Sequence, residues 1–348
     1  MKILMIGLGS IGQRHVRNIR QVLGDGAELL AYRVRGAKTT FTDKLQIREG
    51  VDLEQEYGIT SYTDLNEALA QKPEIAFITN ITSKHMECAL QAAKAGCHLL
   101  IEKPLAADME GVEELKALAE EKKLTVFMGF QNRYHPCVEV IKETVESGML
   151  GKIRYVDAEF SERLTTMHRY EDYRGTYMAQ SVMGGGPVLN LQMHDLDILQ
   201  WIFGVPKSVT AVLQRQSGLE IDVEESASAV FRCGEGENSF PICTHTDFLQ
   251  YPPVHRFKVV GEGGRLEVDL NSTEYAIWLG DERIRSGEYP DFARNSMFLR
   301  ELEDFLAAVR GDREVKIGLQ NGIDTLRMAM AIKKADAEKR EVSLNEIA

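Results

Sequence analysis

The sequence predicts an α/β protein in which a doubly wound parallel sheet is followed by an α+β domain with a large, mostly antiparallel open sheet. Up to about residue 130, short apolar runs alternate with helical patterns, which is typical of parallel strands with helices on both faces. After residue 204, segments of period two follow one another with short turns, which is typical of an antiparallel sheet. We therefore expect a first domain over residues 1–128 and a second over residues 129–348, whose closing helices can pack back on the first.

The elements of the first domain follow from apolar runs and from helix start and stop signals. Thr63 and Asp64 can cap a helix, and Gly96 can end one in the left-handed conformation. We expect strands over residues 1–6, 27–33, 59–62, 74–79, 98–101 and 124–130, with helices directly after the first strand, around 41–49, up to about 71, up to 96 and over 108–123.

The elements of the second domain begin with helices and continue as strands. We expect helices over residues 135–147, 189–203, 298–310 and 322–338. We expect strands over residues 152–161, 208–214, 226–233, 242–248, 256–261, 264–270 and 274–278.

Length and composition narrow the class of protein. The chain of 348 residues is long enough for two cores, and no apolar stretch approaches the roughly 20 residues that span a bilayer. The N-terminus enters a strand without a secretory pattern, so we expect a cytoplasmic location. The net charge of -12 argues against nucleic acid as a partner and favours a small molecule. Five cysteines without a C-x-x-C pair argue against disulfides, and histidines without zinc-site spacing predict no metal.

A glycine-rich turn follows the first apolar run. Gly7, Gly9 and Gly12 have the G-x-G-x-x-G spacing between a strand and a helix. The first glycine permits a tight turn, the second lets the backbone approach a pyrophosphate, and the third lets helix and strand pack closely. The phosphates then lie at the positive end of the helix, against Ser10 and Ile11. The turn therefore predicts a dinucleotide site.

The end of the second strand indicates which dinucleotide binds. A chain built for NAD usually places Asp or Glu about 20 residues after the glycines, where it accepts a hydrogen bond from the ribose 2′-hydroxyl. This chain has Arg33 there, followed by Arg35 and Lys38. Because a cationic cluster favours a 2′-phosphate, we predict NADP in preference to NAD. The alternative is that Arg33 points to solvent.

Glu102-Lys103-Pro104 follows a strand at its carboxyl end, where open α/β sheets bind their ligands. A positively charged nicotinamide beside Lys103 would disfavour its ammonium form, and the lysine could then take a proton from a substrate hydroxyl as hydride leaves. The alternative is a solvated loop lysine. Further candidates for cofactor contact, near the end of the preceding strand, are Thr79, Asn80 and His85.

A second group of polar residues follows the triple glycine at 184–186. If Pro187 opens a helix, Asn190, His194 and Asp197 stand at i, i+4 and i+7 on one face, beside an apolar stripe. A polar row of this kind suits a helix that lines a pocket. Taken alone, His194 would more often be a structural histidine than a catalytic one.

Together these motifs resemble those of the Gfo/Idh/MocA oxidoreductases, the glucose-fructose oxidoreductase and inositol dehydrogenase family. The resemblance covers essentially the whole chain. It implies a Rossmann domain, a second α/β domain whose open sheet often makes oligomer contacts, NAD or NADP as cofactor, and a sugar, polyol or sugar-derived substrate. It also implies that Lys103 and His194 are the acid/base residues of hydride transfer. The matching residues are the glycine turn with His15, the E-K-P at 102–104, Gly129-Phe130 leading to Arg133-Tyr134, and the triple glycine leading to His194.

Position 190 departs from the family pattern, which usually has Asp four residues before the histidine. Asn190 can hydrogen-bond to a neighbour but cannot stabilise an imidazolium by charge. His194 is then less supported as a base. We keep Asn190 in the predicted catalytic set and expect Lys103 to carry more of the proton transfer.

The stretch 168–177 is dense in hydrogen-bonding side chains, which suit a polyhydroxylated or anionic ligand or, equally, a surface or subunit contact. It looks similar to family members of surface-sugar pathways, which implies a sugar or sugar nucleotide. The candidate substrate residues are Arg133, Tyr134, Tyr170, Asp172, Tyr173, Arg174 and His194.

Two other function classes stay open at this point. One is a hydrolase or isomerase that retains its cofactor, and the other is a non-catalytic dinucleotide-binding regulator. Whatever its function, we expect the protein to form a homo-oligomer, a dimer or tetramer, because a sheet with one uncovered face exposes apolar area.

Overall fold

The protein is described by a computed structural model that gives residues 1–34, 36, 39–42 and 46–347. Its internal contacts divide the chain into two compact units. The first unit contains Met1–Phe130 and Arg294–Gly322, and the second contains Gln131–Ala293 and the chain from Ile323 onward. The chain therefore leaves the first unit, builds most of the second, and returns to the first once.

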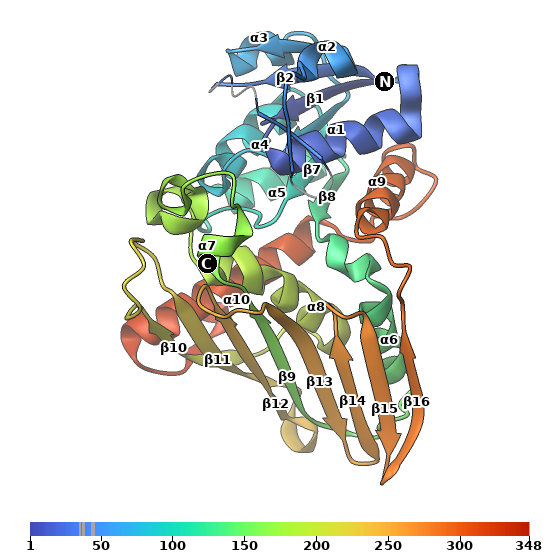
Figure 1. Ribbon diagram of the computed structural model, residues 1–348, viewed down its shortest axis with the longest axis vertical. Helices are drawn as coiled ribbons and strands as arrows, with labels where there is room; N and C mark the ends of the chain where they lie inside the picture. The colour runs from blue at the N-terminus through green and yellow to red at the C-terminus, as the bar shows by residue number, and fades with distance from the viewer. Residues whose placement is uncertain (35, 37–38, 43–45, 348) are drawn as a thin grey trace. The chain divides into compact units, whose positions relative to one another are not determined.

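The first unit is built on a six-stranded sheet with the order β5-β2-β1-β6-β7-β8 (Figure 1), and all its paired strands are parallel. This confirms the predicted doubly wound sheet. Because β2 and β6 lie on opposite sides of β1, the strand order reverses there, and such a reversal opens a crevice at the carboxyl ends of the strands. The strands are β1 (Lys2–Ile6), β2 (Glu28–Tyr32), β5 (Ile59–Tyr62), β6 (Ile75–Ile78), β7 (His98–Glu102) and β8 (Val126–Gly129).

The helices of the first unit come from two parts of the chain. Helix α9, in the returning segment, packs against α1, where Asn295 donates to Asn18 (2.9 Å) and accepts from Arg14 (2.7 Å). The same segment pairs with the edge strand β8 through an isolated bridge from Phe127 to Gly318. The helices are α1 (Ser10–Leu23), α2 (Leu53–Tyr57), α3 (Leu65–Leu69), α4 (His85–Lys94), α5 (Val112–Glu121) and α9 (Asn295–Val309).

The helix expected around residues 41–49 is wrong. The described residues of this region include β3 (Thr40–Phe41) and β4 (Ile47–Arg48), which pair antiparallel. The run Thr39-Thr40-Phe41-Thr42 is β-branched and aromatic, and such residues favour strands over helices. Residues 43–45 lie outside the described residues.

The second unit is built on a nine-stranded sheet with the order β16-β15-β14-β13-β9-β12-β11-β10-β17 (Figure 1). Strands β9 and β12 are parallel and the other neighbours are antiparallel, which confirms the large, mostly antiparallel sheet. Strand β16 was not expected, because its sequence ERIRSGE lacks apolar alternation and it forms an exposed edge. The strands are β9 (Ile153–Ser161), β10 (Ser208–Gln214), β11 (Ser226–Cys233), β12 (Phe240–Asp247), β13 (Val254–Gly261), β14 (Gly264–Asp269), β15 (Glu274–Leu279), β16 (Glu282–Glu288) and β17 (Val342–Ser343).

Helices cover one face of the nine-stranded sheet. Helix α6 contacts β14, and α8 contacts both β9 and α6. In β11, Ala227, Ala229 and Phe231 are buried, whereas Ser228 and Val230 are exposed on the opposite face. The period-two pattern therefore separates a core face from an open face. The helices are α6 (Pro136–Glu146), α7 (Leu164–Met167), α8 (Met193–Phe203) and α10 (Leu319–Glu338).

Two observations bear on the class of protein. Among the residues that the structure describes, no helix has both the length and the apolar character that crossing a bilayer requires. The five cysteines carry free thiols, and four of them are buried.

Candidate active site

The three glycines of the first turn have three different environments. Gly7 has a φ of 100°, and a Cβ there would lie 2.8 Å from the Asn80 backbone. A Cβ on Gly12 would lie 2.4 Å from the Gly7 carbonyl oxygen, because helix and strand are in close contact there. A Cβ on Gly9 would meet no atom within 4 Å. Gly7 and Gly12 are therefore required by the fold, whereas Gly9 borders open space.

The N-terminus of α1 can receive an anion. Gly9 is its N-cap, no side chain caps it, and its first turn carries no acidic residue. Ser10 and Ile11 are half-buried there. The Thr79 hydroxyl donates to the Gly7 carbonyl (2.7 Å) and holds the turn in place. Exposed backbone N–H groups at a helix N-terminus attract phosphate, so these residues fit the pyrophosphate of a dinucleotide.

Arg33 follows β2 at its carboxyl end. Its Nη1 lies 2.5 Å from Oε1 of Glu54, and its side chain is 14% exposed. The Ser61 hydroxyl donates to the same carboxylate oxygen (2.6 Å). The Arg33 side chain is therefore directed toward Glu54 and not freely into solvent. Arg35 and Lys38 lie outside the described residues.

The E-K-P turn is held on both sides by buried histidines. His15 Nε2 lies 2.7 Å from Oε1 of Glu102. His85 Nδ1 lies 2.8 Å from the Pro104 carbonyl oxygen, and its Nε2 lies 3.1 Å from the Asn80 carbonyl oxygen. His85 thus contacts the turn itself and is held by the Asn80 carbonyl, so both can affect a bound cofactor by holding that turn.

Lys103, between these two anchored residues, is half-buried. Burial is the main cause that lowers the pKa of its ammonium group to about 8; the Glu102 carboxylate opposes this shift, and Arg294 adds to it. A lysine with a pKa near the working pH can exist in both protonation states. Lys103 can therefore accept or donate a proton at the carboxyl end of β7.

In the second unit, the glycine run allows close backbone approach. A Cβ on Gly185 would lie 2.6 Å from the Met178 and Tyr177 carbonyl oxygens. Gly186 has a φ of 99°, and a Cβ there would lie 2.3 Å from the Glu224 carboxylate. Larger residues at these positions would displace the start of the following helix.

The helix after the glycines differs from the predicted one in its first turn. Val188–Gln192 is a π-helical turn, and the α-helix α8 begins at Met193. A π turn is wider than an α-helical turn, so the α-helical spacing assumed for the start of this helix does not hold over its first turn. Asn190 Oδ1 instead accepts a hydrogen bond from the Tyr177 hydroxyl (3.1 Å). Local propensity carries no signal for a π turn.

Helix α8 is anchored by buried polar contacts. Arg133 donates to both oxygens of Asp197 (2.7 and 2.6 Å). Asp195 Oδ1 lies 2.8 Å from His255 Nε2, whose ring stacks on Phe160. These contacts are made by the neighbours of His194, and they fix the position of this buried histidine along the sheet.

The predicted substrate residues lie in two different settings. Arg133 and Tyr134 are buried, and Arg133 has Asp197 as its partner. Arg174 is exposed and pairs with Asp172 and Glu220, and the Arg174 guanidinium lowers the pKa of Asp172 to about 2. Tyr170 stacks on His168, and the Tyr173 hydroxyl accepts from the Glu220 backbone N–H.

Sequence reasoning missed two residues that the structure brings to these sites. They are His255, which holds Asp195, and Glu54, which holds Arg33. Each is far along the chain or in a different element from the residue that it contacts, and no motif marks the pair. Tyr177, which holds Asn190, was noted only as the end of the polar stretch 168–177. His15 was noted only as part of the glycine motif.

These features define a class of protein. A doubly wound parallel sheet with an uncapped helix N-terminus at its switch point, and a second unit with a large open sheet, are those of a two-domain NAD-binding oxidoreductase. The chain belongs to the Gfo/Idh/MocA family. The profile of the oxidoreductase family with an NAD-binding Rossmann fold matches residues 1–130, and that of the GFO/IDH/MocA C-terminal domain matches residues 138–267.

The similar proteins and solved structures match this chain over nearly its whole length. The chain is 26% identical over 358 residues to myo-inositol 2-dehydrogenase of Thermotoga maritima, covering 100% of this chain and 99% of that one. Levoglucosan dehydrogenase in complex with NADH superposes with a TM-score of 0.83 at 17% identity, covering 99% of both chains. The WlbA dehydrogenase of Bordetella pertussis, in complex with NADH and UDP-GlcNAcA, has a TM-score of 0.79 at 20% identity, covering 99% of this chain and 98% of that one.

Proposed function

We propose that the protein catalyses reversible hydride transfer between NADP and a hydroxyl-bearing or keto carbon of a sugar, polyol or sugar nucleotide. The observation that carries the proposal is Lys103, a half-buried lysine with a pKa of about 8 at the carboxyl end of β7. The dehydrogenases reported above act in the same class of chemistry by name, and two of them are solved with NADH.

The binding of the cofactor is assigned to the first unit. Gly7, Gly9 and the N-terminal turn of α1 would hold the pyrophosphate by backbone N–H groups, with Ser10 and Ile11 beside it. A bound nicotinamide would supply the acceptor or donor of hydride. The chain's own task at this centre is to position that group and to move a proton.

Lys103 moves the proton. In alcohol oxidation its neutral amine Nζ accepts the hydroxyl proton as the carbon loses hydride, and in ketone reduction its ammonium returns the proton. A pKa of about 8 keeps both forms populated near neutral pH. This role follows from the position of Lys103 after β7, with its turn anchored by His15 and His85.

His194 and Asn190 are assigned to the substrate in the second unit. Asn190, oriented by the Tyr177 hydroxyl, can hydrogen-bond but adds no negative charge to favour an imidazolium on His194. His194 therefore acts as a hydrogen-bonding and secondary proton-transfer group. The exposed pair of Asp172 and Arg174 supplies polar groups that suit a sugar or sugar nucleotide.

The preference for NADP is assigned to Arg33. A guanidinium has a planar set of donors that matches phosphate, and Glu54 orients this one at the end of β2, where the adenosine ribose lies in such folds. The opposing consideration is Glu54 itself, since a carboxylate at this position can accept a hydrogen bond from the 2′-hydroxyl of NAD.

A thermal-shift titration with NADP and NAD side by side tests the cofactor. A ligand that binds only the native state raises the melting temperature, and we expect the larger rise with NADP. A panel of sugars, polyols and sugar nucleotides is then assayed for NADPH formation by absorbance. Cofactor binding without turnover of any member of the panel would instead favour a non-catalytic regulator.

A further inference from the structure

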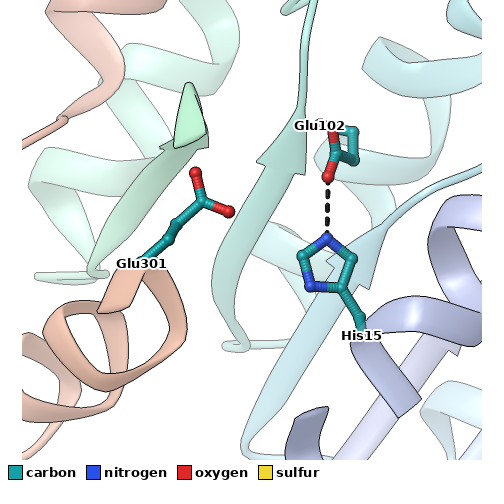
Figure 2. A group of neighbouring side chains, drawn as sticks. All are labelled: His15, Glu102 and Glu301. Atoms are coloured by element: carbon teal, nitrogen blue, oxygen red, sulfur yellow. Dashed lines mark hydrogen bonds and ion pairs between the residues drawn. The ribbon is translucent and has the colours of Figure 1, made fainter. Parts of the chain in front are cut away.

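A buried polar cluster lies behind the E-K-P turn in the first unit. Figure 2 shows His15 of α1, Glu102 of β7 and Glu301 of α9 with their side chains directed toward one another. One ligand-type atom of each lies within 4.8 Å of the others, and the three residues are 0%, 6% and 0% exposed. Buried charged groups require specific partners, so this cluster needs a physical explanation.

The surroundings of His15 indicate which of its ring nitrogens donates to Glu102. His15 Nε2 lies 2.7 Å from Glu102 Oε1, and His15 Nδ1 has no hydrogen-bond partner among the described residues. A buried N–H without an acceptor is costly, whereas a bare ring nitrogen costs less. The ring proton therefore belongs on Nε2, where it donates to Glu102. In this arrangement Oε1 of Glu102 accepts the hydrogen bond.

Packing prevents either group from moving away. The His15 ring contacts Phe77 at 5.3 Å and Phe298 at 6.2 Å between ring centroids. A Cβ on Gly129 of the neighbouring strand would lie only 3.1 Å from the Glu102 carboxyl carbon. The pair is thus confined by β6, α9 and β8.

We infer that His15 is a positioning residue that holds the Glu102 carboxylate behind Lys103, and that this buried charge supports the ammonium form of Lys103. The inference rests on the proposed function for its consequence in catalysis. Its physical basis is the geometry of the cluster.

The charged groups around the turn shift the pKa values of Lys103 and His85. Glu102 raises the pKa of Lys103, and Arg294 lowers it. Glu102 also raises the pKa of His85, which burial lowers, while Glu301 faces the cluster from α9. Loss of the His15 donor would leave the Glu102 carboxylate buried without its partner and favour its neutral form. Lys103 would then lose the charge that supports its ammonium, so its titration midpoint would fall.

Labelling of Lys103 with acetic anhydride as a function of pH, read by peptide mass spectrometry, measures this midpoint without any assay of activity. The exposed Lys94 of the same unit is the internal reference. In the wild type we expect a midpoint near pH 8. In His15→Phe and Glu102→Gln we expect it to fall by about one pH unit, the size of effect that one nearby charge produces.

Three further variants separate positioning from a merely structural role. His15→Gln keeps a side-chain donor and should restore the wild-type midpoint. The double variant His15→Phe/Glu102→Gln should shift no further than Glu102→Gln alone, because both changes act through one carboxylate. His98→Phe is the control. It removes a histidine of β7 whose Nδ1 accepts from the Thr125 backbone N–H, and it should leave the midpoint unchanged. Circular dichroism identifies any variant that fails to fold.

The outcomes distinguish this inference from the proposed function. An unmoved midpoint in folded His15→Phe and Glu102→Gln overturns the inference, whether or not the enzyme turns over. A shifted midpoint without dehydrogenase activity supports the inference and counts against the proposed function. With both correct, the acidic limb of kcat/KM for alcohol oxidation moves to lower pH in parallel with the labelling midpoint.

Discussion

At the scale of single residues, the chemistry depends on groups that burial has changed. Lys103 has a lowered pKa because it is withdrawn from water, and its neighbours Glu102 and Pro104 are each fixed by a buried histidine. The sequence motif indicated the lysine. The partners that hold it were visible only once α1 and α4 were in place beside the turn.

Replacement of Lys103 should affect turnover more than replacement of His194. We expect Lys103→Ala to lower kcat for alcohol oxidation by about 100-fold or more, the usual contribution of a general base, and His194→Ala to lower it less. The wild-type rate should rise with pH through about 8, since oxidation needs the neutral lysine. Steady-state kinetics from pH 6 to pH 10 (roughly the range that brackets a lysine of lowered pKa) measures both. Near-normal turnover in Lys103→Ala would contradict this assignment.

Replacement of Arg33 should weaken the proposed preference for NADP. We expect Arg33→Asp to lower the ratio of NADP to NAD affinity at least about ten-fold, because a hydrogen bond to a charged group contributes about 1.5–3 kcal/mol. Isothermal titration with each cofactor measures the ratio. Arg48→Asp is the matched control, since Arg48 pairs with Glu56 in the same region. An unchanged ratio in Arg33→Asp would remove the basis for NADP.

At the scale of elements, the two sites depend on how helices begin. Helix α1 starts without a side-chain cap after a turn that only glycine permits, and α8 starts from a π-helical turn that follows three glycines. Buried contacts from Asp195 to His255 and from Asp197 to Arg133 then hold α8. Apolar periodicity predicted that these helices exist, but it could not predict the π turn or the partners.

Substitutions should distinguish the role of Gly12 in the fold from the proposed role of Gly9 in cofactor binding. Gly12→Ala places a Cβ 2.4 Å from the Gly7 carbonyl oxygen, so we expect a lower melting temperature and no stabilisation by cofactor. Gly9→Ala meets open space and has a φ of -68°, so the free protein should melt normally while cofactor stabilises it less. Differential scanning fluorimetry with and without NADP measures both. A normal cofactor response in Gly9→Ala would mean that the pyrophosphate lies elsewhere.

Loss of the buried pair under α8 should destabilise the second unit. Arg133→Met leaves Asp197 buried without its partner, which typically costs about 3–5 kcal/mol. Urea unfolding followed by tryptophan fluorescence reports this unit, since Trp201 and Trp278 both belong to it. Arg133→Met/Asp197→Leu should recover part of the loss because no lone charge stays buried. Arg174→Met, at an exposed pair, should show no measurable change.

At the scale of the whole molecule, the open face of the nine-stranded sheet is a candidate contact surface. Val212 and Val230 are 58% and 45% exposed on neighbouring strands whose alternate residues are buried or half-buried. We propose that this face mediates a homo-oligomer, because a sheet face without covering helices can be buried by a second copy of the chain.

The oligomer should therefore dissociate when this face is charged. We expect Val212→Glu/Val230→Glu to lower the molar mass measured by light scattering after size exclusion, relative to the wild type. Val182→Glu changes a still more exposed valine outside the sheet and should leave the molar mass unchanged. A wild-type protein that elutes as a monomer at micromolar concentration would refute the inference.

The sequence by itself determined the two sheets, the glycine-rich turn between the first strand and the first helix, and the family, because periodicity and motif spacing are local properties of the chain. Only the tertiary structure decided that Arg33 pairs with Glu54, that Arg133 is committed to Asp197, and that His15 holds Glu102. These pairs join residues 21, 64 and 87 positions apart, respectively. Which of many charged side chains become neighbours depends on how the elements pack, and local pattern does not encode that.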